Sequence, residues 1–201
     1  MAARKAKAEE LQRGVAVAAI LKRRGDALVV TGIGNAVHDV AASGDVAENF
    51  YLSGIMGGAA MVGMGLALAR PERRVLVITG DGEMLAGIGS LATIGVEKVP
   101  NLSIVVIDNR AYAATGMQAT HTARGVDLAG IARASGFSHA VAVSDAAGLR
   151  AVVDDAYEKP GPYFAVLQVK SEGSPRVKVP ADGTFTARRF RRALLGDEMN
   201  P

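Results

Sequence analysis

Short runs of branched apolar residues alternate along the chain with stretches whose apolar residues recur at helical spacing. Extended runs cover residues 27–32, 73–80, 102–109, 139–143 and 163–169, and a weaker one covers 49–54. Helical spacing predicts helices over 5–23, from after Gly54 to Ala69, and over 83–97, 127–135 and 145–157. Continuous apolar strands that alternate with helices are typical of a parallel sheet covered on both faces. The pattern therefore predicts an α/β fold, a three-layer αβα arrangement with a mainly parallel central sheet.

Length and composition fit one globular domain with a full core. The chain has 201 residues, of which 49% are apolar and 21% charged, a balance typical of folded rather than disordered proteins. The sequence contains no cysteine, which excludes disulfides, cysteine zinc sites and iron–sulfur clusters held by the chain itself. We predict a single domain over residues 1–175 and a C-terminal arm, 176–201, that is rich in Pro, Gly and Arg and ends in a short basic helix.

Charge and hydropathy argue against nucleic-acid and membrane partners. The net charge is +3 and aromatic residues make up only 4%, whereas a nucleic-acid face would interleave basic and aromatic residues on one surface. The apolar stretch 54–69 has 16 residues, fewer than the roughly 20 that a membrane-spanning helix needs, so it predicts a closely packed buried helix. Met1 is followed by charged residues and not by an apolar signal segment, so we expect a cytoplasmic protein.

Four predicted strands end in glycine or polar residues, at 32–35, 53–57, 80–82 and 108–109. In open parallel sheets, ligands bind beyond the carboxyl ends of the strands, so these four ends are expected along one binding edge. The first of them begins like a dinucleotide-binding fingerprint, but the third glycine of that fingerprint would fall on Val37. A Rossmann-type cofactor is therefore disfavoured.

The segment from Gly80 to Asn109 places polar groups at the ends of the two strongest strands. Asp81 follows one strand and begins a helix, and Asn109 closes the next strand. Free N–H groups at a helix start favour phosphate, whereas the carboxylate of Asp81 repels it. A hard divalent cation between them resolves the conflict, because Mg2+ binds carboxylate, amide and phosphate oxygens. Taken separately, Asp-Gly is also an ordinary turn and Asp-Asn an ordinary strand end.

These residues resemble the thiamin diphosphate (ThDP) motif, in which GDG is followed by 26 residues and an Asn. The resemblance implies that Asp81, Asn109 and the backbone carbonyl of Ala111 hold Mg2+, and that the diphosphate of the cofactor lies on the helix start. The cofactor-binding residues implied around this motif are Gly80, Gly82, Glu83 and Tyr112.

A second segment, SGIMGGAAMVGMGLALA, is similar to the stretch upstream of GDG in the same family. By position, the carbonyl of Gly54 accepts the 4′-amino group of the cofactor, and the side chain of Met56 supports its bent V shape. The match runs from about residue 27 to 169 and covers only the diphosphate-binding (PP) half of such enzymes. The sequence departs from many relatives at Glu83, where they have Ser or Ala, and at Arg110, where they often have Gly.

Among ThDP enzymes, the chain looks most like the sulfopyruvate decarboxylase β-subunits and the matching part of phosphonopyruvate decarboxylases. The stretches NFYLSGIMGGA, GSLATIG and VVIDNRAYAATGMQATHT carry this resemblance. It implies non-oxidative decarboxylation of a small anionic 2-oxoacid to an aldehyde. It also implies a partner, because the glutamate that hydrogen-bonds the cofactor's pyrimidine belongs to a pyrimidine-binding (PYR) domain, for which the chain has no room. We expect a hetero-oligomer with a PYR-domain α-subunit, α2β2 or larger, that is active only when complete.

The loop 110–125 follows the implied metal ligands and is expected to border the substrate. Its polar side chains Gln118, Thr120 and His121 are candidates for binding an anionic sulfonate or phosphonate. Gln118 and His121 are also our candidates for the catalytic residues that transfer protons in this loop. A surface loop with an incidental histidine is the alternative.

Three other functions are compatible with the sequence. A carboligase of the acetolactate-synthase type would form a larger hydroxyketone in place of an aldehyde and CO2. The β-subunit of a 2-oxoacid:ferredoxin oxidoreductase carries the same domain, but the absence of cysteine excludes a cluster in this chain. Outside the family, a non-catalytic phosphate- or nucleotide-binding module would bind some other phosphate ligand without ThDP.

Overall fold

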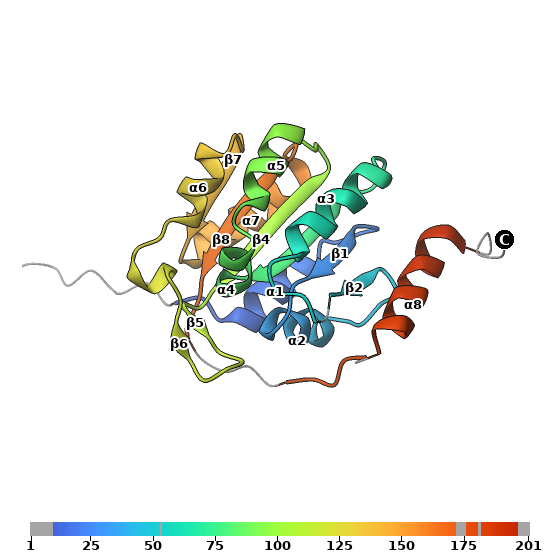
Figure 1. Ribbon diagram of the computed structural model, residues 1–201, viewed down its shortest axis with the longest axis horizontal. Coiled ribbons are helices and arrows are strands. Elements are labelled where there is room, and N and C mark those ends of the chain that lie inside the picture. Colours follow the sequence, from blue (N-terminus) through green and yellow to red (C-terminus); the bar gives the residue numbers. More distant parts are fainter. Residues whose placement is uncertain (1–9, 53, 172–175, 181, 197–201) are drawn as a thin grey trace, which may run out of the picture.

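A central sheet lies between two layers of helices in the computed structural model, which describes residues 10–52, 54–171, 176–180 and 182–196 (Figure 1). The strands of this sheet are β1 (Leu28–Thr31), β2 (Asn49–Tyr51), β3 (Val75–Gly80), β4 (Leu102–Asp108), β7 (His139–Val143) and β8 (Tyr163–Gln168). They lie in the order β2-β1-β3-β4-β8-β7, and every neighbouring pair is parallel. The predicted three-layer αβα fold with a mainly parallel sheet is confirmed.

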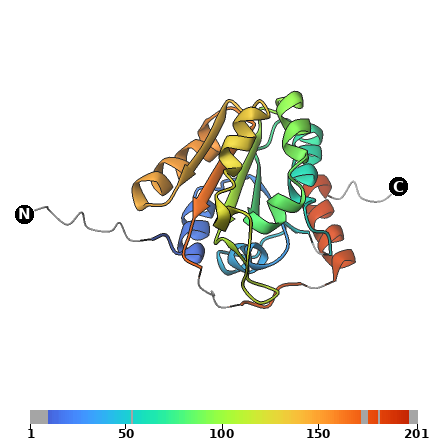
Figure 2. The ribbon, with the colours of Figure 1, turned by 60° about the vertical axis from the view of Figure 1, so that its left-hand side comes forward.

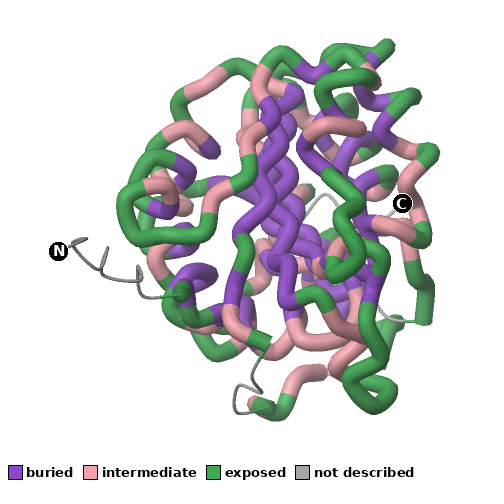
Figure 3. Tube along the Cα trace, turned by 90° about the vertical axis from the view of Figure 1, so that its left-hand side faces the viewer, coloured by how far each residue is buried: buried purple, intermediate pink, exposed green. Residues whose placement is uncertain are grey.

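The helices divide between the two faces of the sheet (Figure 2). One face is covered by α1 (Arg13–Leu21), α2 (Asn35–Ala42) and α7 (Ala146–Glu158), and the other by α3 (Ala59–Ala69), α5 (Ser90–Glu97) and α6 (Leu128–Ala134). In β3, Val75 and Val77 pack on the α3 side. Leu76 and Ile78 pack on the α1 side. Because such a strand is buried on both faces, as the purple strands in Figure 3 show, successive positions such as 75–78 are apolar and do not alternate with polar ones.

The region predicted as one helix over 83–97 contains two helices. α4 (Asp81–Ala86) and α5 are separated by residues 87–89. At this break the backbone of Gly87 packs against Gly57, and a Cβ on Gly87 would lie 2.1 Å from the Gly57 carbonyl oxygen. The helical periodicity thus predicted the type of element correctly, but the prediction of an uninterrupted helix was wrong.

Other differences from the predicted elements are local. The N-terminal helix predicted over 5–23 is described only as α1, and residues 1–9 lie outside the described part. Helix α2 forms where no element was predicted. The loop after β4 contains a small hairpin, β5 (Ala111–Tyr112) with β6 (Gln118–Ala119), followed by a 3-10 turn, η1 (Thr122–Arg124).

The C-terminal helix α8 (Gly183–Leu195) lies beside the edge strand β2 (Figure 1). The rings of Phe190 and Phe50 are 5.2 Å apart between centroids. Two nitrogens of Arg189 donate to the two carboxylate oxygens of Asp45, both at 2.8 Å. The arm therefore covers the edge of the sheet with an apolar contact and a bidentate ion pair. Among the residues that the structure describes, no helix is long and apolar enough to cross a membrane.

Candidate active site

The carboxyl ends of β3 and β4 lie side by side because the two strands are parallel neighbours. Gly80 pairs with Ile107 in their register. This places Asp81, the first residue of α4, beside Asp108 and Asn109, and all three of these polar residues are buried. Both strands are mostly apolar, with Thr79 and Ser103 as buried exceptions, so the side chains of Asp81, Asp108 and Asn109 concentrate the polar groups at this edge.

Three oxygen atoms converge beyond the strand ends. Oδ1 of Asn109 faces two acceptors, Oδ1 of Asp81 at 3.1 Å and the Ala111 carbonyl at 2.9 Å. It accepts only one long hydrogen bond, from the Ala111 amide at 3.4 Å. Turning the Asn109 amide over would let its nitrogen donate to both acceptors. A hard cation relieves the same conflict without that turn, because adjacent oxygens in octahedral Mg2+ coordination, with bonds of about 2.1 Å, lie roughly 3 Å apart. The predicted ligand set therefore fits a divalent cation.

Threonine hydroxyls hold the other oxygen of Asp81. Oγ1 of Thr120 donates to Oδ2 of Asp81 at 2.5 Å. Oγ1 of Thr122 lies 3.2 Å from the same oxygen and 2.8 Å from Oδ1 of Asp108. Burial raises the pKa of Asp81 to about 6, against the opposing hydrogen bond from Thr120 and with a further increase from the Asp108 carboxylate. A bound cation would favour the charged form of Asp81 and offset this cost of burial.

Glu83 points toward the loop before α3, and its carboxylate ties α4 to that loop. Oε1 of Glu83 accepts hydrogen bonds from the backbone amides of Gly57 and Ala59, each at 3.1 Å. The side chain fits because residue 32 is glycine: a Cβ on Gly32 would lie 2.5 Å from Oε2 of Glu83. Burial raises the pKa of Glu83, and the hydrogen bonds from Ala59 and Gly57 oppose the increase. This arrangement explains how a glutamate can stand next to the GDG motif without facing a phosphate.

The loop before α3 also carries Met56. Its side chain lines the same cavity as Asp81 and keeps 46% of its surface exposed. That exposure distinguishes Met56 from the core side chains and leaves its surface free for a ligand. Gly54 has a positive φ of 77° and lines a smaller adjoining cavity, which shares Gly34 and Asn35 with the first.

Gly82 makes room for an aromatic ring. A Cβ on Gly82 would lie 2.4 Å from Cε1 of Tyr112, so glycine at this position is required by packing within the protein. Gly80 differs, because the position of its missing Cβ has open space around it. The first glycine of the motif therefore borders free volume, and the second supports the ring of Tyr112.

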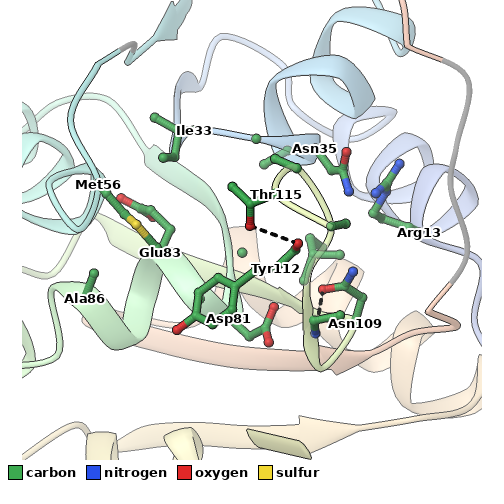
Figure 4. Close-up of a pocket in the computed structure, with 18 residues that line it drawn as sticks. Arg13, Ile33, Asn35, Met56, Asp81, Glu83, Ala86, Asn109, Tyr112 and Thr115 are labelled. Carbon is green, nitrogen blue, oxygen red and sulfur yellow. Dashed lines mark hydrogen bonds between the residues drawn. The ribbon is translucent and has the colours of Figure 1, made fainter. Parts of the chain in front are cut away.

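Most of the predicted site residues line one cavity of about 530 Å³, drawn in Figure 4. Those that do are Met56, Gly80, Asp81, Gly82, Glu83, Asn109, Ala111 and Tyr112. Gln118 and His121 do not line it, and both are exposed. The amide of Gln118 instead donates within its own hairpin to the carbonyl of Thr115 at 2.9 Å. The contact of Gln118 and His121 with a substrate stays a prediction.

Sequence reasoning assigned no role to Arg13, Asn35 and Thr115, which also line the cavity. Asn35 closes a strand end that was placed on the binding edge, so its position was available from the pattern. Arg13 lies on the buried face of α1 with Ala16 and Ile20. An arginine on the apolar face of a helix was the signal that could have found it.

The sequence and the fold match known proteins. Residues 32–167 match the family model described as thiamine pyrophosphate enzyme, C-terminal TPP binding domain. The chain is 35% identical over 171 residues to the sulfopyruvate decarboxylase subunit beta of Methanothermobacter thermautotrophicus, covering 85% of this chain and 89% of that protein. It is 38% identical over 170 residues to the phosphonopyruvate decarboxylase of Streptomyces viridochromogenes, covering 83% of this chain and 42% of that protein. The X-ray structure described as that of "a putative thiamin diphosphate-dependent enzyme" from Mycobacterium smegmatis shares the fold, with a TM-score of 0.69 and 23% identity over 82% of this chain and 33% of that one.

Proposed function

Because the chain belongs to the thiamine pyrophosphate enzymes, whose C-terminal TPP-binding domain it matches over residues 32–167, we propose that it is the β-subunit, or PP domain, of a ThDP- and Mg2+-dependent 2-oxoacid decarboxylase of the sulfopyruvate or phosphonopyruvate type. The observation that carries the proposal is the convergence of oxygens from Asp81, Asn109 and Ala111 at the edge of an open cavity. The identity to proteins named as separate beta subunits supports the split form.

The residues of this chain bind and orient the cofactor in the proposed enzyme. Asp81, Asn109 and the Ala111 carbonyl hold Mg2+, which in turn holds the diphosphate. Met56 supports the rings of the cofactor, and the Gly54 carbonyl accepts its amino group. When bound, ThDP supplies the electron sink for loss of CO2 from a 2-oxoacid. The contribution of the chain is thus orientation of the reacting groups, which lowers the entropic part of the barrier.

A second subunit completes the proposed site. Met56 lines the cavity and is 46% exposed, and two apolar side chains in the same loops are also exposed, Ile55 by 54% and Met117 by 48%. Such a surface is suited to burial against a partner. We propose a PYR-domain α-subunit in a hetero-oligomer, α2β2 or larger, that binds a small anionic 2-oxoacid between the subunits.

The test is isolation of the tagged chain from its native cell extract with whatever subunit binds it. The complex is assayed for bound ThDP and for CO2 release from sulfopyruvate and phosphonopyruvate. Analysis of the organic product separates an aldehyde from the larger hydroxyketone of a carboligase. Asp81→Asn in the same complex should lose Mg2+-dependent ThDP binding. A wild-type complex without ThDP and without CO2 release would contradict the proposal.

A further inference from the structure

A second, smaller cavity of about 300 Å³ adjoins the main one, and the two differ in charge. They meet at residues 33–35, which line both. The carboxylates of Asp81 and Glu83 line the main cavity, whereas the described residues around the smaller one include no carboxylate. Arg176 and His38 line the smaller cavity instead. Its lining therefore favours an anion over a cation.

Arg176 comes to this cavity from the C-terminal arm. Residues 176–180 pass along α2 before α8 begins (Figure 1). Nδ1 of His38, on α2, lies 2.9 Å from the carbonyl oxygen of Val177. Because a carbonyl oxygen can only accept, Nδ1 carries a proton and donates. His38 thus holds the backbone directly after Arg176 and keeps the arm beside the cavity.

The charge of Arg176 is free to bind a ligand. Arg176 is exposed, and none of the ion pairs within the described part of the chain includes it. Arg13 in the main cavity differs, because its Nε lies 2.6 Å from a carboxylate oxygen of Asp39. A guanidinium also presents its N–H groups as a rigid fork that fits tetrahedral oxyanions. Arg176 therefore has both the charge and the geometry to bind such a group.

We propose that Arg176 binds the sulfonate or phosphonate group of the 2-oxoacid in the smaller cavity, with His38 as a positioning residue. This inference rests on the proposed function. In that function the Gly54 carbonyl accepts the cofactor's amino group, beside which the 2-oxoacid reacts. Because Gly54 also lines the smaller cavity, a substrate reacting there extends its charged tail toward Arg176. The tail then avoids the carboxylates of the main cavity, which would repel it.

The test uses substrate analogues that lack the reactive carbonyl and so cannot be decarboxylated. 3-Sulfopropionate and 3-phosphonopropionate carry the two charged tails, and butyrate carries a methyl group in their place. Binding is measured by calorimetry with ThDP and Mg2+ present, on the full chain in complex with its co-purifying partner. R176Q removes the guanidinium, and R176K keeps the charge without the fork. K178Q is the matched control, because Lys178 is exposed on the same arm and lines neither cavity.

The wild-type complex should bind both charged analogues more tightly than butyrate. R176Q should bind them roughly tenfold more weakly, the lower end for a charge-assisted hydrogen bond because Arg176 is open to solvent. Its Tm and its affinities for butyrate and ThDP should change little, and R176K should recover part of the loss. K178Q should stay within about twofold of wild type. H38A should share the loss of R176Q, and H38N, which keeps a donor for the Val177 carbonyl, should restore binding.

The inference is overturned if the wild-type complex binds ThDP but does not prefer the charged analogues to butyrate. It is also overturned if R176Q binds them as wild type does, or if K178Q loses as much as R176Q, which would show only a general attraction by net charge. A loss of ThDP affinity in R176Q would assign Arg176 to the cofactor and refute its role in substrate binding. Wild-type binding by H38A would refute the positioning role of His38. Failure of the wild-type complex to bind ThDP would instead refute the proposed function.

Discussion

Replacement of Gly87 by alanine tests how the loop that carries Met56 is held. A Cβ on Gly87 would lie 2.1 Å from the carbonyl oxygen of Gly57 and 2.8 Å from its carbonyl carbon. In the reverse direction, a Cβ on Gly57 would lie 2.7 Å from the Gly87 amide nitrogen. These atoms all belong to the backbone, so no side-chain rotation can relieve the overlap. Gly87→Ala must therefore move either the loop or the turn between α4 and α5.

The expected cost follows from that overlap. Overpacking that forces backbone shifts costs about 1–3 kcal/mol. In a domain of this size each kcal/mol lowers Tm by about 2–4 °C, so Gly87→Ala should lower Tm by roughly 2–12 °C. Gly89 provides a matched control in the same turn. Its backbone is right-handed helical, with φ −61° and ψ −21°, and nothing lies within 4 Å of a Cβ there. Gly89→Ala should be neutral or stabilise by about 0.4–1 kcal/mol, because alanine restricts the unfolded chain.

The assays are thermal unfolding, which gives Tm, and urea unfolding of the full chain, both followed by circular dichroism, for the wild type and both variants. The slope of the free energy against urea should be the same for all three, so that midpoints report stability. If Gly87→Ala is as stable as Gly89→Ala, the backbone contact with Gly57 does not constrain the loop, and the explanation of the helix break fails.

Glu83→Ala removes the acceptor of two backbone amides, those of Gly57 and Ala59, and should lower the free energy of unfolding by at least about 2 kcal/mol in urea. Glu97→Ala on the exposed surface of α5 should change it by less than about 0.5 kcal/mol. Equal effects of the two substitutions would contradict the contact of Glu83 with these amides. Thr120→Val removes the hydroxyl that donates to Asp81 and should weaken Mn2+ binding about tenfold in a titration with ThDP present. An unchanged Kd for Mn2+ would show that Thr120 does not position Asp81 for the metal. Asp45 has a pKa lowered by hydrogen bonds from an arginine of α8, so its stabilising effect exists above its unfolded pKa, roughly 4, and is lost at lower pH. Wild type should therefore be more stable than Asp45→Asn at pH 7, and thermal unfolding should show the gap closing by pH 3.

The binding edge could be predicted from the sequence because its physical cause is local. Parallel strands buried on both faces are apolar at nearly every position, so β3 and β4 were visible as apolar runs interrupted only by Thr79 and Ser103. A parallel pair in register brings the residues after both strands together, which placed Asp81 near Asn109. Glycine pairs and polar strand ends then marked the side of the sheet on which the cavity lies.

The features that the sequence did not reveal depend on contacts between distant segments. The interruption of the 83–97 helix arises from Gly57, thirty positions before Gly87, and leaves no mark on the periodicity of apolar residues. The burial of Arg13 depends on the packing of α1 against α2, a helix that was not predicted. The inward direction of Glu83 depends on the missing Cβ of Gly32. Each of these needs the tertiary structure, because no local propensity encodes it.

Helix α4 connects the two sides of the cavity. It has six residues, so its axis is about 9 Å long at 1.5 Å per residue. Asp81 begins the helix at the proposed metal site. The Glu83 carboxylate, from the middle of the helix, and the Gly87 backbone, directly after its last residue, both contact Gly57, next to Met56. One short, rigid element therefore sets the spacing between the metal ligand and the apolar prop. A continuous helix through residues 87–89 would remove the second attachment, so the break in helical structure serves the geometry of the site.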